Sequence, residues 1–442
     1  MRQNCKNQLP LSPFWPPHQL GEELREISKI LDENPQISEL LLLDLCDKVS
    51  SKRGAPGLSA DQVLRCALLK QTHQFSYERL AFHLSDSMSA RVFCRLPLGY
   101  APGSSVLQEN ISRIHATTWE QVNRVLLQWA AQRRLERGRK IRIDATSVDS
   151  DIHHPMDSDL LCDGIEVITR LLRRCPPMSR RSFSDHRLRA KRRRLAILNQ
   201  RGKKRQQAYQ DLLKVARKVR SYARSVLKDE VLLGDSSPLE LVCKLRHYLD
   251  LHERVIDQTE RRLFQGESVP AAEKVVSLFE EHTDIIRKGG RETIFGHKIY
   301  LTCGPSSLML DCVVVRGNPC DSTRTQPLLK RQQELYGRWP RQASLDGCFA
   351  SQDNLKWAKK QGIRDVVFAK KAGLKIEQMA HSSWIYQQLR HFRAGIEGCI
   401  STLKRAFGLR RCNWKGWPHF QQYVHLSVVS FNLIVLARLL LR

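Results

Sequence analysis

The sequence predicts an α/β protein with an all-helical N-terminal region and a large helical segment inserted after its first strand. Three observations support this prediction. Residues 1–135 show the period of amphipathic helices, strand-like alternation begins near Arg139, and strand-like segments then stop for about 150 residues before they resume near His297. A chain of 442 residues is long enough for two or three domains with a substantial core.

Residues 1–135 are expected to form a domain of short helices, because capping-box patterns recur along them. The patterns are Ser59-x-x-Gln62, Ser105-x-x-Gln108 and Thr118-x-x-Gln121. Such a cluster of helices in a basic protein favours a helix-turn-helix unit that contacts DNA. A helical dimerisation unit remains an open alternative.

The first strand is expected at Ile141–Thr146, where apolar and polar side chains alternate as in a half-buried strand. This alternation places Asp144 on the polar face of the strand, beside Arg142. The strand belongs to residues 136–164, which form the first part of the sheet domain. Residues 291–442 are expected to form the remainder of that domain.

Residues 165–290 are expected to form a basic helical insertion. The segment from Arg180 to Arg205, which we call the basic ridge, contains Asp185 as its only acid. Repulsion among like charges makes an anionic partner a better explanation than a plain solvated face. The residues proposed to contact nucleic acid are Arg192, Arg193, Lys203 and Lys204. Three long helices are expected at Leu212–Val226, Pro238–Phe264 and Ala271–Arg287.

The remaining elements should alternate between strands and helices. Their expected bounds are strands at His297–Thr302, Leu308–Val315, Gln342–Asp346 and Asp365–Phe368, and helices at Thr325–Tyr336 and Ser351–Gln361, followed by a helix that carries Glu397. The apolar run Val424–Leu441 contains His425, Asn432 and Arg438. We therefore expect a buried helix there and not a membrane span.

Composition points to a nucleic-acid partner in a reducing compartment. Lys and Arg number 73 against 45 Asp and Glu, which gives a net charge of +28 and favours a polyanion. An anionic membrane surface is the competing partner. The N-terminus lacks the apolar core of a signal peptide. The 13 cysteines include no Cys-x2-Cys pair, which favours free thiols in a cytosolic protein.

Three carboxylates are the candidate metal ligands. Asp144 and Asp346 each end a short alternating strand on its polar face, and adjacent strands lie about 4.8 Å apart. In a helix, Arg393, Glu397 and Lys404 fall within about 40° of one another and form one polar stripe. Three converging carboxylates suit a pair of Mg²⁺ ions that act on a phosphodiester. The alternatives are ordinary strand-end residues and an intrahelical ion pair. Other carboxylates compete on chemistry alone: Asp149, Asp151, Asp157, Asp311 and Asp321.

Five segments together resemble the insertion-sequence transposases of the DDE, RNase H-like superfamily, and most closely the group called "not classified yet". They are Asp144-Ala-Thr-Ser-Val-Asp149, Ile152–Asp163, Phe295-Gly-His-Lys298, Asp346-Gly-Cys-Phe-Ala-Ser351 and Gly395–Lys404. Related transposases carry a Tyr-x2-Arg-x3-Glu-x6-Lys signature. Arg393, Glu397 and Lys404 match it, whereas Arg390 stands at the place of the Tyr.

The resemblance implies a five-stranded RNase H-like sheet whose first and fourth strands are adjacent. It assigns Asp144, Asp346 and Glu397 as catalytic residues that bind two Mg²⁺ ions, for which Mn²⁺ can substitute. Arg393 and Lys404 would neutralise phosphate, and Lys298 would face the same site. The implied partners are double-stranded DNA, as terminal inverted repeats and as target, and a second copy of the chain or a larger assembly. The implied location is the bacterial cytoplasm, at the nucleoid.

Two other functions remain open on the sequence. One is a metal-dependent nuclease that cuts DNA without strand transfer. The other is a DNA-binding protein that descends from a transposase and has lost catalysis. The three carboxylates favour an active enzyme over an idle one.

Overall fold

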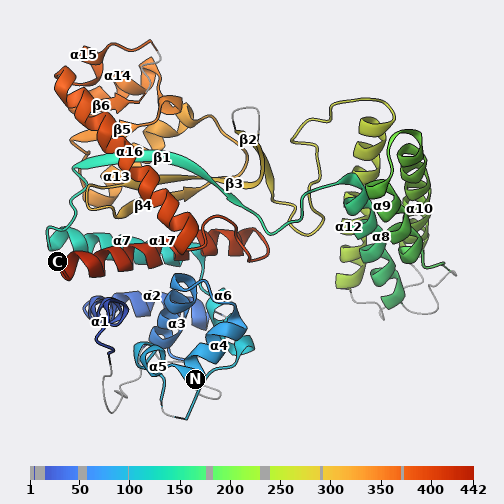
Figure 1. The fold of residues 1–442 in the computed structure, drawn as a ribbon, viewed down its shortest axis with the longest axis horizontal. Helices are drawn as coiled ribbons and strands as arrows, with labels where there is room; N and C mark the ends of the chain where they lie inside the picture. The colour runs from blue at the N-terminus through green and yellow to red at the C-terminus, as the bar shows by residue number, and fades with distance from the viewer. Residues whose placement is uncertain are drawn as a thin grey trace. The chain divides into compact units, whose positions relative to one another are not determined.

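The computed structural model describes residues 4, 15–47, 57–97, 99–175, 183–228, 239–288, 292–369 and 373–442. The chain divides into two compact units (Figure 1). The first unit comprises residues 1–151 and 286–442, and the second comprises residues 152–285. The N-terminal helices and the sheet, which were expected as separate domains, therefore belong to one unit.

A mixed sheet organises the first unit. Its strands are β1 (Lys140–Asp149), β2 (Asp284–Lys288), β3 (Glu292–Cys303), β4 (Met309–Val314), β5 (Gln342–Leu345) and β6 (Asp365–Phe368). The order is β2-β3-β1-β5-β6, and β4 also pairs with β3. β1 runs antiparallel to β3 and parallel to β5. Without the short β2, β5 is the fourth strand along the chain, so the expected adjacency of the first and fourth strands is confirmed.

The helix expected at Ala271–Arg287 is wrong. Residues 268–283 form turns and irregular chain, and β2 follows them. The side chain of Gln258 replaces the helical hydrogen bonds of Val275: its Oε1 accepts from the Val275 N–H at 2.9 Å, and its Nε2 donates to the Val275 carbonyl at 3.2 Å. The apolar side chains that suggested a helix instead pack on the second unit's core, as Val275 and Leu278 do.

The helices that follow the strands are α13 (Thr325–Tyr336), α14 (Gln352–Lys360), α15 (Ile376–Met379), α16 (Ser383–Ala406) and α17 (Trp417–Leu440). α16 passes across the sheet in contact with β1, β5 and β6 (Figure 1). Ser382 fixes its start, because the Ser382 side chain accepts a hydrogen bond from the Ile385 N–H. This helix carries Arg393 and Glu397 over the sheet.

The N-terminal helices are α1 (Gln19–Asp32), α2 (Gln36–Cys46), α3 (Ala60–Thr72), α4 (Tyr77–Asp86), α5 (Met88–Phe93), α6 (Ser104–Ser112) and α7 (Ala116–Gln132). Ser59 and Gln62 form the expected capping box. The other two capping-box predictions are wrong, because Ser105 and Thr118 lie inside α6 and α7. α7 begins before Thr118, with His115 as its N-cap residue. The Asp44 carboxylate accepts from the His115 N–H at 2.7 Å and so holds this earlier start in place.

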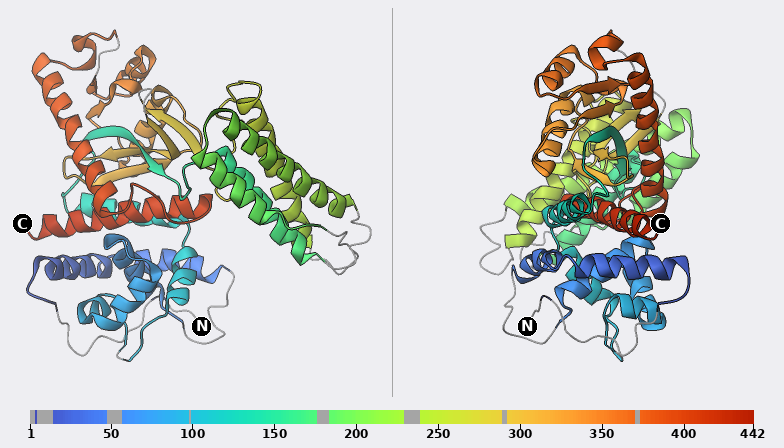
Figure 2. Two further views of the ribbon diagram at one scale, coloured as in Figure 1. Left: turned by 45° about the vertical axis from the view of Figure 1, so that its right-hand side comes forward. Right: turned by 90° about the vertical axis from the view of Figure 1, so that its left-hand side faces the viewer.

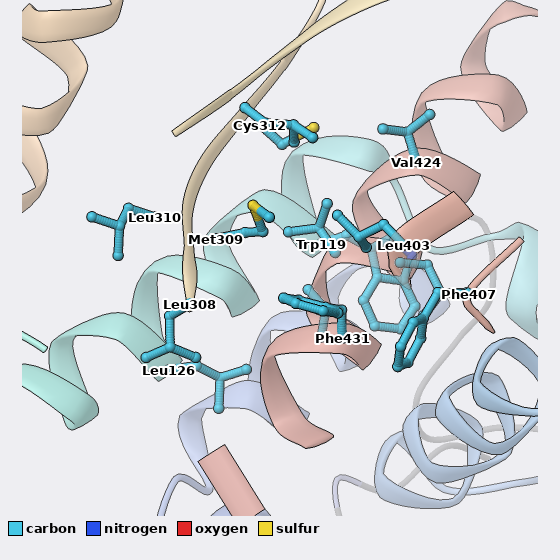
Figure 3. Packing of buried hydrophobic residues seen from close by; sticks show 14 of the residues in the cluster. Trp119, Leu126, Leu308, Met309, Leu310, Cys312, Leu403, Phe407, Val424 and Phe431 are labelled. Atoms are coloured by element: carbon cyan, nitrogen blue, oxygen red, sulfur yellow. The ribbon is translucent and has the colours of Figure 1, made fainter. Parts of the chain in front are cut away.

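α17 joins the N-terminal helices to the sheet. It packs against α1, α3, α7 and β4, and in Figures 1 and 2 the pair α7 and α17 lies between the sheet and the other N-terminal helices. Figure 3 shows Trp119 of α7, Met309 of β4 and Phe431 of α17 in this shared core. Among the described helices only α17 is long and apolar enough to cross a membrane, yet 78% of its most apolar window is buried. The expected buried helix is confirmed.

The second unit is a bundle of α8 (Asp157–Arg174), α9 (Arg187–Asn199), α10 (Gly202–Lys228) and α12 (Leu239–Leu263) around a core of its own. α10 contains the helix expected at 212–226, and α12 lies within the range expected at 238–264. The unit begins at Ile152 and not at residue 165. The reason is that α8 buries its apolar face, including Leu161 and Ile168, against α10 and α12.

Candidate active site

Asp144 and Asp346 lie next to each other on adjacent parallel strands. Arg142 pairs with Ser344 and Ile143 with Leu345, so Asp144 lies beside Asp346, which directly follows β5. The two carboxylates share the sheet face that α16 covers, where the Ser344 hydroxyl donates to the Leu389 carbonyl of that helix at 2.8 Å. The alternation that the sequence predicted for β1 therefore brings Asp144 under α16.

The guanidinium of Arg393 contacts all three candidate carboxylates. Its Nη2 lies 2.9 Å from an Asp144 oxygen and 3.5 Å from an Asp346 oxygen, while its Nη1 lies 2.8 Å from a Glu397 oxygen. The side chain of Asp144 is 13% exposed, that of Asp346 is 32% exposed and that of Glu397 is 62% exposed. The three acids thus converge on one guanidinium, and their exposure to solvent increases from Asp144 to Asp346 to Glu397.

Burial governs the electrostatics of Asp144. Loss of solvent raises the pKa of its carboxyl, the neighbouring Arg393 lowers it, and the negative charges of Asp346 and Glu397 raise it again. The Ala145 N–H also donates to one Asp144 oxygen at 2.8 Å. If all four groups are ionised, three carboxylates and one guanidinium leave a formal charge of −2. Such a group attracts further cations.

The residues fit a hard divalent cation by donor type, since all three acids offer carboxylate oxygens. In the described part of the chain, however, no three His, Cys, Asp or Glu side chains are close enough together to hold an ion. The physical reason is that Arg393 lies among the three acids. Binding of a metal ion here requires Arg393 to release at least one carboxylate.

Lys298 does not lie on the same face of the sheet as these carboxylates. In the register of β1 and β3, Asp144 pairs with Leu301 and Lys298 pairs with Ser147, so Lys298 points to the opposite face of the sheet. There its ammonium lies 2.9 Å from an Asp321 oxygen. The expectation that Lys298 faces the catalytic carboxylates is therefore wrong.

The basic ridge is partly neutralised by acids that the sequence did not place beside it. Arg189 and Arg193 both pair with Asp211, and Arg194 pairs with Asp159 at 2.7 Å. In contrast, Arg192, Lys203 and Lys204 are exposed and form no ion pair with another described residue. Arg180 and Arg181 lie outside the described residues. Of the four proposed contacts, Arg193 is thus already paired.

A basic cavity adjoins the far end of α16, and sequence reasoning found only part of it. The cavity has a volume of about 400 Å³. Its charged lining residues are Lys70, Lys404, Arg405, Arg410 and Arg411, and no acid lines it. Only Lys404 was singled out by the sequence. The other cations carried no recognisable signal, because they come from the end of α3, the last turn of α16 and the segment after it.

Lys70 is the most unusual member of this cavity, which we call the α3–α16 cavity. Lys70 is only 4% exposed, and its ammonium lies 4.6 Å from the ring centre of Tyr77 and 5.4 Å from that of Trp414. Burial lowers the pKa of Lys70 to about 8. A buried ammonium that faces a cavity free of acids favours an anionic ligand.

The walls of the α3–α16 cavity are built by hydrogen bonds between its two helices. The Gln71 side chain donates to the Phe407 carbonyl and the Gln74 side chain to the Arg405 carbonyl, both at 2.8 Å. These bonds satisfy carbonyls at the end of α16. Trp414 is only 8% exposed and packs beside Tyr423.

Two family models match the chain. The model described as "Transposase DDE domain" matches residues 254–433, a range that includes Asp346 and Glu397 but not Asp144. The model described as "Transposase domain (DUF772)" matches residues 16–113, within the N-terminal helices. Comparison with curated proteins and with solved structures finds no match.

Proposed function

The chain belongs to the DDE transposases of insertion sequences, and we propose that Asp144, Asp346 and Glu397 are its catalytic carboxylates. The observation that carries this proposal is the convergence of all three acids on the Arg393 guanidinium. Within the family we place the chain in the "not classified yet" group, on the motifs around these residues.

We propose that the three carboxylates hold two Mg²⁺ ions, with Mn²⁺ as a substitute. Bound ions of this kind activate the attacking oxygen and stabilise the leaving oxygen of a phosphodiester. Asp144, the most buried of the three acids, would hold the ions together with Asp346 and Glu397. Arg393 balances the acids in the absence of metal. It would turn to phosphate once metal ions and DNA are bound, since the ions would then supply the counter-charge of the carboxylates.

The enzyme acts on DNA as a polynucleotidyl transferase. We propose that it hydrolyses phosphodiester bonds at the terminal inverted repeats of its element, and that the freed 3′-hydroxyl attacks target DNA. The N-terminal helices and the exposed cations Arg192, Lys203 and Lys204 are the proposed DNA contacts outside the active site. Pairing of two element ends implies a homodimer or a larger assembly, which acts in the bacterial cytoplasm at the nucleoid.

A strand-transfer assay tests this function. Purified full-length protein, Mg²⁺ and a labelled duplex with the DNA that flanks its coding region should give cleavage at the repeat end and then joined products with target plasmid. Cleavage without joined products would indicate the nuclease alternative. Binding without cleavage, in Mg²⁺ and in Mn²⁺, would indicate an idle DNA-binding protein.

The α3–α16 cavity is proposed to receive a phosphate of the bound DNA strand. Lys404 lies seven residues after Glu397 on α16, so it stands about 10 Å further along the helix, close to the reacting bond. Lys70→Met and Arg410→Gln are each expected to weaken binding of the element end by about tenfold and to reduce its salt dependence. Fluorescence anisotropy at several salt concentrations measures both effects.

Lys356→Gln is the matched control for this binding measurement, because Lys356 is an exposed cation on α14 that does not line the cavity. Equal losses of affinity in the Lys356, Lys70 and Arg410 variants would mean that the cavity contributes only general positive charge. An unchanged affinity in both cavity variants would exclude it as a phosphate site.

A further inference from the structure

A pair of thiols lies directly beneath the catalytic helix. Cys303 ends β3 and Cys399 lies on α16, two residues after Glu397. The thiol of Cys303 donates to the sulfur of Cys399, and the two sulfurs are 3.9 Å apart. Cys303 is fully buried and Cys399 is 8% exposed. The two side chains come from segments 96 residues apart, so no sequence spacing indicated this pair.

Arg142 gives the pair an unusual electrostatic environment. Its side chain is buried on β1, two residues before Asp144, and its Nη2 lies 3.4 Å from the Cys303 sulfur and 3.8 Å from the Cys399 sulfur. Its Nη1 donates to the Phe392 carbonyl at 3.0 Å. No described carboxylate forms an ion pair with Arg142. A buried guanidinium favours electron-rich groups beside it, and the sulfurs of Cys303 and Cys399 are the groups that lie there.

The geometry also divides the roles of the two sulfurs. The Cys303 thiol donates to the Cys399 sulfur, and Cys303 is fully buried whereas Cys399 is 8% exposed. Cys399 is therefore the sulfur that a dissolved oxidant can reach, and Cys303 is the sulfur that can then resolve it. This division of roles is typical of oxidisable cysteine pairs.

The pair is coupled to the active site through Gly395. Gly395 lies on α16 between Arg393 and Glu397, and a Cβ at this position would overlap with the Arg142 guanidinium. Arg142 therefore touches the helix at the turn that presents the catalytic Glu. A change in the charge or position of the sulfurs below Arg142 is transmitted to this turn.

We propose that Cys303 and Cys399 form a hydroperoxide-sensitive disulfide site that controls the position of the catalytic helix. The Cys399 thiol gives its proton to solvent, its sulfur attacks one peroxide oxygen, and the O–O bond breaks to give Cys399 sulfenic acid. The leaving hydroxide or alkoxide takes up a proton from solvent and departs as water or an alcohol. The Cys303 sulfur then attacks the Cys399 sulfur, the S–OH bond breaks, and the hydroxyl leaves as water with the Cys303 proton. Two thiols lose two electrons in total, and the hydroperoxide gains them.

Oxidation has two consequences for α16. The sulfurs must approach from 3.9 Å to about 2.05 Å, which draws Cys399 towards β3. Arg142, whose Nη2 contacts both sulfurs, must move with them while it remains buried. A misplacement of about 1 Å at a reacting group can lower a rate by about 10²-fold. This coupling rests on the proposed catalytic role of Glu397, whereas formation of the disulfide does not.

The test uses full-length protein in which the exposed cysteines Cys243, Cys320 and Cys348 are replaced by Ser. Treatment with hydrogen peroxide, alkylation of remaining thiols and peptide mass spectrometry should yield the Cys303–Cys399 cross-link, which dithiothreitol removes. DNA cleavage should fall at least tenfold on oxidation and recover on reduction. In Cys303→Ala, peroxide should instead leave Cys399 sulfenic acid, which dimedone traps.

Cys66 and Cys94 provide a matched control pair in the same unit. Both side chains are fully buried, so neither sulfur has the access to solvent that Cys399 has. This pair should stay reduced. Absence of the Cys303–Cys399 cross-link, or equal oxidation of both pairs, would overturn the proposed site. A cross-link with unchanged cleavage would overturn its coupling to α16. Lack of cleavage in the reduced protein would count against the proposed function alone.

Discussion

Replacing Asp346 by Asn should lower the rate of DNA cleavage by about 10³-fold or more, with little effect on DNA binding. The substitution keeps the shape of the side chain but removes one charged ligand from a site of three carboxylates. Loss of several kcal/mol of stabilisation from a metal site corresponds to a change of this size. Single-turnover cleavage of the element end measures the rate, and anisotropy measures the affinity.

Asp353→Asn is the control for this variant. Asp353 is an exposed acid in the first turn of α14, and it has the same chemistry without contact to Arg393. Its variant should cleave DNA at the wild-type rate. If Asp346→Asn also cleaves normally while its fold and DNA affinity are intact, Asp346 is not a metal ligand and the catalytic assignment fails.

The strands and helices of the sheet domain could be predicted closely from the sequence. The expected bounds of α13 at Thr325–Tyr336 and of β6 at Asp365–Phe368 agree with the structure. Local patterns suffice for such elements, because their apolar side chains recur with the period of the element. The segment Ala271–Arg287 has similar apolar spacing but no helix, since contacts with Gln258 decide its conformation. Those contacts are tertiary and have no local pattern.

The candidate site shows the same division between local and tertiary information. The polar face of β1 and the stripe on α16 are local properties, so Asp144 and Glu397 could be placed on their elements. The face to which Lys298 points depends on the register of β3 against β1. That register placed it with Asp321 and away from the carboxylates. Lys70 and Cys303 reach their surroundings only through the fold, so no motif could reveal them.

Replacing Arg393 by Gln should lower cleavage by about 10²-fold, because a preorganised cation near developing charge contributes about this much to a rate. The variant should also melt at a lower temperature in chelator, where three carboxylates then share the site without their counter-ion. Added Mg²⁺ should restore more of the melting temperature in the variant than in the wild type. Differential scanning fluorimetry with and without Mg²⁺ measures this difference.

The pH dependence gives an independent check on Arg393. Burial raises the pKa of Asp144, and the positive charge of Arg393 lowers it. An acid must lose its proton to bind metal, so activity is lost as the pH falls through this pKa. Removing Arg393 raises the pKa further, and the loss of cleavage should therefore begin at a higher pH than in the wild type.

Arg390→Gln is the matched control, since Arg390 is an exposed cation one turn before Arg393 that lies over the Tyr386 ring, 5.8 Å from its centre. Its variant should keep the wild-type pH profile and the wild-type response to Mg²⁺. The same shift in both variants would mean that α16 contributes only its general positive charge. A shift confined to Arg393→Gln would identify the guanidinium among the three acids as the group that metal and DNA displace.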